Sequence, residues 1–136
     1  MTHRMTAAEF HRRLSTPVKR PVRQSGSKYN NERVRDGDLV FDSKAEHRRW
    51  LALSTYVRAG LISELRRQVR YVLIPSQKRP SGGSERACHY VADFVYLDGS
   101  GATVVEDVKG VDTPEWVIKR KLMLHVHGIE VRAVRG

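Results

Sequence analysis

The apolar positions from residue 31 onward follow two periodicities, which predict two helices and four strands. After Ser43, apolar residues recur at helical spacing as far as Arg58 or Ala59, and a second helical pattern follows Thr113. Runs rich in β-branched and aromatic residues predict strands over residues 68–74, 89–97, 102–109 and 129–134. The order is helix, three strands, helix, strand, which indicates an α/β sandwich around one core.

Capping and turn residues mark where these elements end. Ser43-Lys-Ala-Glu46 matches the capping box that opens a helix, and Gly60 can supply its left-handed C-terminal residue. Thr113 caps the second helix, which Gly128 closes. We expect residues 61–67 to form a connector and residues 77–85 to form a flexible loop.

The composition indicates a single domain with a polyanionic partner. The chain has 136 residues, and its 25 Lys and Arg against 15 Asp and Glu give a net charge of +10. No apolar run approaches the roughly 18 residues that a membrane span needs, so we expect a cytoplasmic protein without a membrane partner. The lone Cys88 excludes an internal disulfide. The positive excess favours nucleic acid, although a solvated basic face would give the same count.

More than half of the positive excess lies near the N-terminus. Residues 1–31 hold seven Lys or Arg and one acid, a net charge of +6. Prolines and a Gln-Ser-Gly-Ser segment in this region are typical of a linker. We therefore expect residues 1–27 to be a basic, largely flexible arm and residues 28–136 to be the folded domain. The arm is either a disordered tail or a segment that follows DNA phosphates.

The hairpin formed by the second and third predicted strands carries the candidate chemistry. With a three-residue loop over residues 99–101, Asp93 falls directly opposite Asp107. Two like charges so placed are destabilising unless a cation neutralises them. Lys109 projects from the same face as Asp107, because side chains alternate along a strand. This register therefore predicts two carboxylates and an ammonium group in one place.

A two-residue loop would give a different site. It would pair Asp93 with Glu106 and turn Asp107 and Lys109 to the opposite face. We prefer the first register because it keeps the lysine beside the acids. The competing interpretation is that these are ordinary surface acids on a half-exposed hairpin. Against it, both strands are apolar on both faces, which is typical of a covered sheet.

Glu46 supplies a third carboxylate from the first helix. The residues that follow it at helical spacing are apolar: Trp50, Leu53 and Val57. Glu46 therefore lies at the head of the stripe that faces the sheet. The capping box explains a glutamate here as well, because its side chain would hold the Ser43 backbone. Orientation toward a sheet that already carries two acids favours a metal site, with the cap as the alternative.

These residues together resemble the signature of the PD-(D/E)XK nuclease superfamily. The matching segments are Tyr90-Val-Ala-Asp93-Phe94 and Glu106-Asp107-Val-Lys109-Gly110, with Glu46 as the helix acid. Further segments are similar to small nuclease-like, Holliday-junction-resolvase-like proteins of phages and prophages: residues 28–31, 41–46, 59–62 and 119–122. The resemblance runs from about Lys28 to the C-terminus. It departs from the usual pattern in lacking a proline before Asp93 and in having Glu106 before the second acid.

The resemblance implies a restriction-endonuclease-like core of order αβββαβ, with helices flanking a central mixed sheet. It also implies a metal-dependent endonuclease that hydrolyses phosphodiester bonds in DNA. The enzyme would act in phage DNA recombination, replication or processing, in the host cytoplasm. Its substrate would include branched DNA such as a Holliday junction. Related nucleases cut two strands as dimers, so a homodimer is compatible with this interpretation.

The resemblance also assigns roles to individual residues. Glu46, Asp93, Asp107 and the backbone carbonyl of Val108 would bind Mg²⁺ or Mn²⁺ through hard oxygen ligands. Lys109 would orient the attacking water or stabilise the developing oxyanion. Gln68 would support the site, with a plain polar residue near a strand end as the alternative.

Basic residues outside the hairpin are candidates for DNA contact: Lys28, Lys119, Arg120 and Lys121. A solvated helix face explains the last three equally well. A non-catalytic DNA-binding or packaging accessory, whose acids merely balance Lys109, is the competing function. An RNA-binding protein of ribosomal type would explain the charge but not three converging acids.

Overall fold

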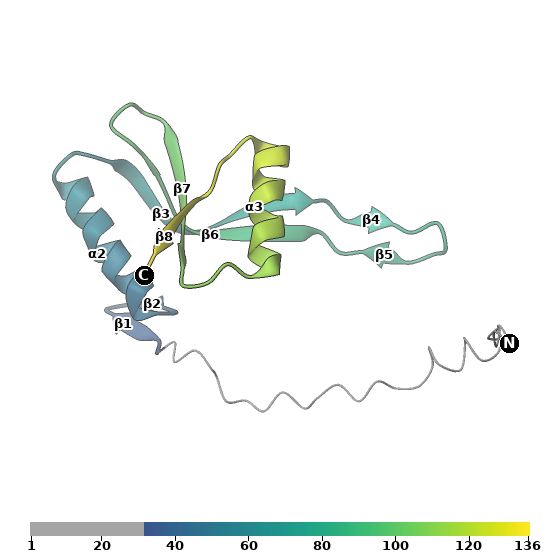
Figure 1. Cartoon of the computed structure of the whole chain (residues 1–136), viewed down its shortest axis with the longest axis horizontal. Coiled ribbons are helices and arrows are strands. Elements are labelled where there is room, and N and C mark those ends of the chain that lie inside the picture. The colour runs from purple at the N-terminus through teal and green to yellow at the C-terminus, as the bar shows by residue number, and fades with distance from the viewer. Residues whose placement is uncertain (1–31) are drawn as a thin grey trace, which may run out of the picture. The chain divides into compact units, whose positions relative to one another are not determined.

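A four-stranded mixed sheet forms the centre of the computed structural model, which describes residues 32–136 (Figure 1). Its strand order is β3 (Ser63–Ile74), β6 (Cys88–Leu97), β7 (Thr103–Lys109) and β8 (Arg132–Arg135). The first three strands pair antiparallel, and β7 pairs parallel with β8. A parallel pair needs a crossover, and the second helix supplies it. The predicted α/β class with a mixed central sheet is confirmed.

Both predicted helices form, with the predicted caps. Helix α2 (Lys44–Arg58) begins after Ser43, whose Oγ accepts a hydrogen bond of 3.1 Å from the Glu46 amide. Helix α3 (Pro114–His127) begins after Thr113, whose hydroxyl accepts from the Trp116 amide at 3.2 Å. Gly128, at φ 66°, closes α3 in the left-handed conformation that glycine adopts without a steric cost.

The buried apolar side chains divide into two clusters, one beside each helix. Trp116 and Met123 of α3 pack with residues of β3, β6 and β7: Leu73, Tyr90, Ala92, Val95 and Val105. Leu53 of α2 packs with Phe94, Tyr96 and Val104. The two helices thus pack on different parts of the same sheet, and Asp93 and Asp107 lie where these parts meet.

Strand β3 is longer than predicted. The prediction placed its start at Gln68 and a connector over residues 61–67, whereas the strand begins at Ser63 and pairs with Leu97 of β6. The charged run around Leu65 hides the alternation, and a bulge near Glu64, at φ 53°, interrupts it further. The last strand is shorter than predicted, because it begins at Arg132 instead of Ile129.

The segment over residues 77–85 is a two-stranded ribbon, which corrects the prediction of a loop. Strands β4 (Gln77–Lys78) and β5 (Ser84–Glu85) pair antiparallel and extend the β3–β6 pair beyond the sheet (Figure 1). Gly82 and Gly83, both at positive φ, form the tip. A second small hairpin, β1 (Val34–Asp36) and β2 (Leu39–Phe41), precedes α2.

The predicted basic arm, residues 1–27, lies outside the described residues, as does Lys28. In the part that the structure describes, no helix has both the length and the apolar character needed to cross a membrane.

Candidate active site

The hairpin register is the one that places the acids together. Leu97 pairs with Thr103 and Phe94 with Glu106, and the Asp98 amide donates to the Ala102 carbonyl at 2.9 Å. The loop therefore has three residues, as predicted. Continued by one step, this register brings Asp93 level with Asp107.

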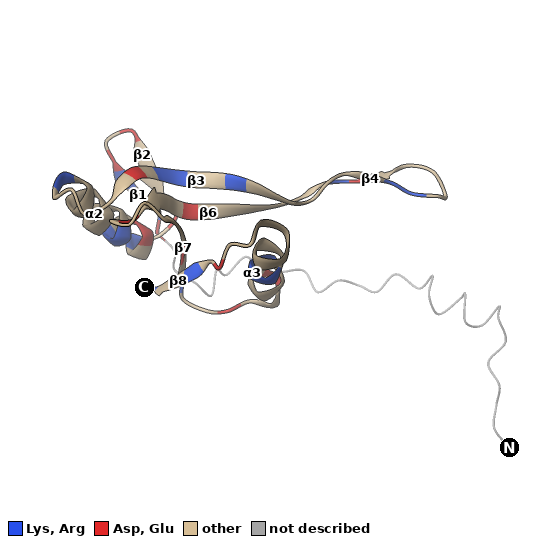
Figure 2. Ribbon diagram, turned by 90° about the horizontal axis from the view of Figure 1, so that it is seen from above, with Lys and Arg blue, Asp and Glu red and all other residues tan. Residues whose placement is uncertain are grey.

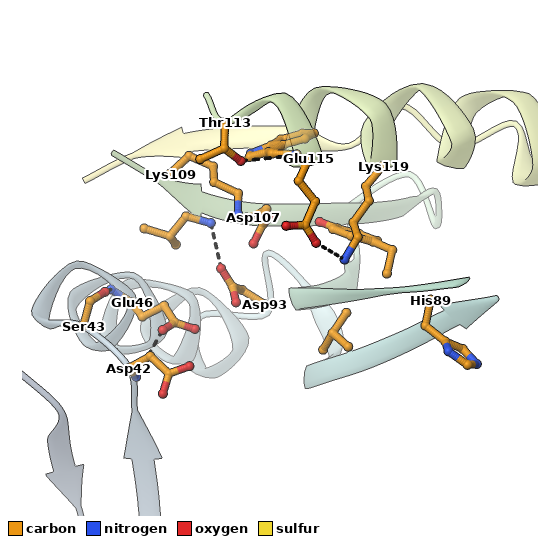
Figure 3. A pocket seen from close by; sticks show the side chains of 14 residues that line it. Asp42, Ser43, Glu46, His89, Asp93, Asp107, Lys109, Thr113, Glu115 and Lys119 are labelled. Carbon is orange, nitrogen blue, oxygen red and sulfur yellow. Dashed lines mark hydrogen bonds and ion pairs between the residues drawn. The ribbon is translucent and has the colours of Figure 1, made fainter. Parts of the chain in front are cut away.

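The two strands separate just beyond that point, and the Asp93 side chain lies in the gap. Paired residues of β6 and β7 end at Phe94 and Glu106. The next hydrogen bond runs from the Val108 amide to Asp93 Oδ2, at 2.9 Å. A carboxylate thus takes the place of a backbone carbonyl in the ladder, which fixes Asp93 against the strand that carries Asp107 and Lys109 (Figure 3).

Gln68 of β3 lies opposite Asp93 of the neighbouring strand β6 and joins two of the acids. Its Nε2 donates at 3.3 Å to Asp93 Oδ1 and at 3.3 Å to Glu46 Oε1. Gln68 is in the middle of β3, not at its start as predicted, and its φ of 52° is left-handed. This conformation interrupts the alternation: Leu65 packs in the α2 cluster, whereas Val69 packs in the α3 cluster.

The two carboxylate oxygens of Glu46 make different contacts. Its Oε2 accepts the amide hydrogen of Asp42 at 3.2 Å, and its Oε1 accepts from Gln68. The return bond of the capping box therefore goes to Asp42, one residue before the predicted Ser43. Glu46 is buried, with 6% of its surface exposed, although it belongs to the first turn of a helix. The two interpretations that the sequence left open are compatible.

Asp107 and Lys109 form an ion pair next to Asp93. The Lys109 Nζ lies 3.0 Å from Asp107 Oδ2. Burial and the neighbouring Asp93 raise the pKa of Asp107 to about 7, against the opposing effect of Lys109. Burial also raises the pKa of Asp93. One lysine therefore does not compensate the buried carboxylates, and the cluster favours additional positive charge or protons.

The chemistry of this donor set fits a hard divalent cation. Five carboxylate residues line one pocket together with Val108: Asp42, Glu46, Asp93, Asp107 and Glu115. Hard cations such as Mg²⁺ prefer oxygen ligands of this kind. Within residues 32–136, no three His, Cys, Asp or Glu side chains are arranged as they stand to hold a metal ion.

The pocket has a volume of about 420 Å³ and opens between the starts of the two helices (Figure 3). Lys119 lines it and pairs with Glu115 at 3.0 Å. Arg120 and Lys121 do not line this pocket; they border a separate depression with Leu124. Among the predicted DNA-contacting residues that the structure describes, only Lys119 is at the pocket.

A buried ion pair that the sequence analysis did not predict, Arg49 with Glu106, joins α2 to β7. Glu106 has none of its surface exposed, and its Oε1 accepts hydrogen bonds from Arg49 of α2. Asp107 therefore faces the pocket and Glu106 does not. The sequence does contain a signal for a buried Arg49: this residue is one turn before Leu53 and so lies on the apolar stripe of the helix.

Other residues that line the pocket were also not predicted as site residues, among them Asp42, Tyr90 and Trp116. The Trp116 ring centre is 5.5 Å from Lys109 Nζ, so the ring packs behind the ammonium group. Burial and the nearby Asp107 raise the pKa of Tyr90, which keeps its phenol neutral. In the sequence, Tyr90 and Trp116 have the pattern of ordinary core positions, because aromatic side chains at these spacings usually belong to the core.

The fold and the pocket define an α/β protein with a buried carboxylate cluster at a strand separation. Comparison with family models adds that residues 26–134 match the family described as protein of unknown function (DUF1064), and the chain belongs to this family. Comparisons with curated proteins and with solved structures gave no match.

Proposed function

We propose that this protein is a metal-dependent DNA endonuclease of the PD-(D/E)XK superfamily. The observation that carries the proposal is the meeting of Glu46, Asp93, Asp107 and Lys109 in one pocket, with Gln68 joining two of the acids. These residues come from α2, β3, β6 and β7, so a purely local structural reason does not account for their convergence.

The topology supports the same proposal. The elements α2, β3, β6, β7, α3 and β8 follow the order αβββαβ, with the last two strands parallel. This order is the one expected of a restriction-endonuclease-like core. The ribbon and the β1–β2 hairpin are additions to that core.

The roles of the residues follow from their contacts. Glu46, Asp93 and Asp107, with the Val108 carbonyl, would hold Mg²⁺ or Mn²⁺. The bound cation would acidify the attacking water and neutralise charge on the phosphorane. Gln68 fixes Asp93 and Glu46 relative to each other, because its amide donates to both.

The Lys109 ammonium group is placed to stabilise negative charge. It is half-buried between Asp107 and the Trp116 ring, so its direction is restricted. A fixed ammonium group costs little reorganisation when charge develops beside it. The net charge of +10 and Lys119 at the pocket favour a polyanionic substrate.

Cation dependence separates this function from that of a DNA-binding or packaging accessory. Labelled linear and branched duplexes are incubated with Mg²⁺, Mn²⁺, Ca²⁺ or EDTA, and both binding and cleavage are measured. We expect cleavage with Mg²⁺ or Mn²⁺ and none with EDTA. Binding without cleavage under every condition would assign the protein to the accessory class. A preference for the branched duplex would identify the enzyme as structure-selective.

Replacing Glu46 by glutamine tests whether this residue acts beyond the helix cap. The glutamine oxygen can still accept the Asp42 amide, but the negative charge is removed. We expect Mg²⁺-dependent cleavage to fall by about 100-fold or more, with a melting temperature near that of the wild type. Glu46→Ala, which removes both roles, should also lower the melting temperature. Normal cleavage by Glu46→Gln would reduce Glu46 to a cap.

A further inference from the structure

The long β3–β6 pair leaves one of its faces uncovered beyond the pocket. Arg70, Val72 and Ile74 alternate along β3 with residues of the α3 cluster and are exposed. Val72 and Val91 have 46% and 44% of their surfaces exposed, whereas Leu73 has 3%. Helix α2 packs only on the other half of the pair, around Leu53 and Phe94.

This open face is continuous with the candidate active site. His89, Val91 and Asp93 are alternate residues of β6, and all three line the pocket. On the neighbouring strand β3, Arg70 is two residues after Gln68. The Arg70 Nη2 lies 3.1 Å from Nδ1 of His89. A ligand bound at Asp93 can therefore extend outward along the face without leaving the protein surface.

The outer part of this face is strongly basic. Residues 70–86 contain four Lys or Arg and one acid, a net charge of +3. Three of the basic residues lie in the ribbon or directly after it: Lys78, Arg79 and Arg86, all exposed. In the described part of the chain, only Arg79 of these three pairs with an acid, Glu85, at 3.5 Å. Figure 2 shows these charges along β3 and out to the ribbon.

We propose that the open face of β3–β6 and the β4–β5 ribbon bind a duplex DNA arm that extends from the scissile phosphate. The roughly nine residues between Asp93 and Ser84 span about 30 Å, the length of about nine base pairs. This inference rests on the proposed function, because it names the substrate of that site.

Two features favour duplex DNA over other occupants. The aromatic residues of this region, Tyr71 and Tyr90, pack in the α3 cluster, so the open face lacks the stacking platform that single strands need. A second copy of the chain would bring another ribbon of the same charge against this one, which opposes pairing between them. Phosphates, by contrast, complement the positive charge of Arg70 and of the basic residues at the ribbon.

The test measures DNA affinity in Ca²⁺ at several salt concentrations, so that binding is measured independently of cleavage. A ribbon variant carries Lys78→Gln, Arg79→Gln and Arg86→Gln. A matched control carries Arg35→Gln, Arg58→Gln and Arg132→Gln, which removes the same charge from β1, α2 and β8. All six side chains are exposed, so both proteins should fold, and melting temperatures verify this.

We expect the ribbon variant to bind a long duplex at least tenfold more weakly than the wild type, and the control less than threefold. The slope of log affinity against log salt should fall by about 0.9 for each phosphate that the variant no longer neutralises, or by about 2 to 3 in all. Wild-type affinity should rise as the arm is lengthened from about four to about ten base pairs, and the ribbon variant should lack this rise.

Equal affinities and slopes for the ribbon variant and the control would overturn the inference. Dimerisation that disappears in the ribbon variant, with DNA binding unchanged, would overturn it too and assign the face to a second copy. The proposed nuclease function fails separately: a protein that shows the ribbon-dependent affinity but no cleavage in Mg²⁺ binds DNA as inferred without being an enzyme.

Discussion

Asp107→Asn should make the metal-free protein more stable at neutral pH and, at the same time, abolish Mg²⁺-dependent cleavage. The asparagine keeps the shape of the side chain but removes a charge that is buried beside Asp93. The same change removes a metal ligand, so cleavage should fall by at least about 100-fold. Higher stability together with lower activity is the result expected of a site whose repulsion is relieved by a cation.

The raised pKa of Asp107 determines how the stability of the folded state changes with pH. Because the folded-state pKa of Asp107 is about 7, against an ordinary value of 3.8, the native state holds more protons than the unfolded state between these values. The contribution of Asp107 to stability is therefore greatest below about pH 4 and falls as the pH rises toward 7. The fall should be on the order of 2–4 kcal/mol, and it should be smaller in Asp107→Asn.

Urea denaturation between pH 4 and 8, without divalent cations, measures this difference. Asp112→Asn is a matched control, because Asp112 pairs with Arg135 outside the pocket. The control should follow the wild-type curve and keep its cleavage activity. Parallel curves for the wild type and Asp107→Asn would show that Asp107 carries no unfavourable buried charge.

Arg49→Met should destabilise the fold by about 3–5 kcal/mol, because it leaves Glu106 fully buried without its partner. Among the described residues, Glu106 Oε2 has no hydrogen-bond partner, so the hydrogen bonds of this carboxylate come from Arg49. Chemical denaturation measures this destabilisation. We expect the double variant Arg49→Met with Glu106→Leu to recover most of the stability, because the second change removes the unpaired charge.

The outcome that would contradict this account is a cost below about 1 kcal/mol for Arg49→Met alone. Glu106→Leu alone serves as the companion control: it should cost less than Arg49→Met, because the partly exposed Arg49 can turn toward water whereas the buried glutamate cannot. Cleavage per folded molecule should persist in the double variant, since neither residue lines the pocket.

The core of the site could be predicted from the sequence because it depends on local rules. The Asp98-Gly-Ser-Gly segment predicts a hairpin with a loop of two or three residues, and the three-residue loop is preferred because its register keeps Lys109 beside the acids. Period-two alternation then places Asp107 and Lys109 together. The Ser43 cap and the apolar stripe of α2 orient Glu46 in the same way.

What the sequence did not predict depends on longer-range or unusual backbone features. The left-handed Gln68 has no sequence signal comparable to a glycine, yet it interrupts the alternation of β3. The Arg49–Glu106 pair joins residues 57 positions apart. The ribbon has the sequence of a loop, because Pro80 and two glycines are typical of loops, whereas here they form the tip between β4 and β5.

The central claim is tested most directly by nicking of supercoiled plasmid DNA in Mg²⁺, with wild type, Lys109→Met and Lys44→Met compared at equal concentration. Lys44 is an exposed lysine that pairs with Glu32 and does not line the pocket, so its variant controls for the removal of one charge. The account predicts nicking by wild type and Lys44→Met, EDTA-sensitive in both, and a decrease of about 100-fold or more in Lys109→Met. Absence of nicking by the wild type, or equal nicking by Lys109→Met, would contradict it.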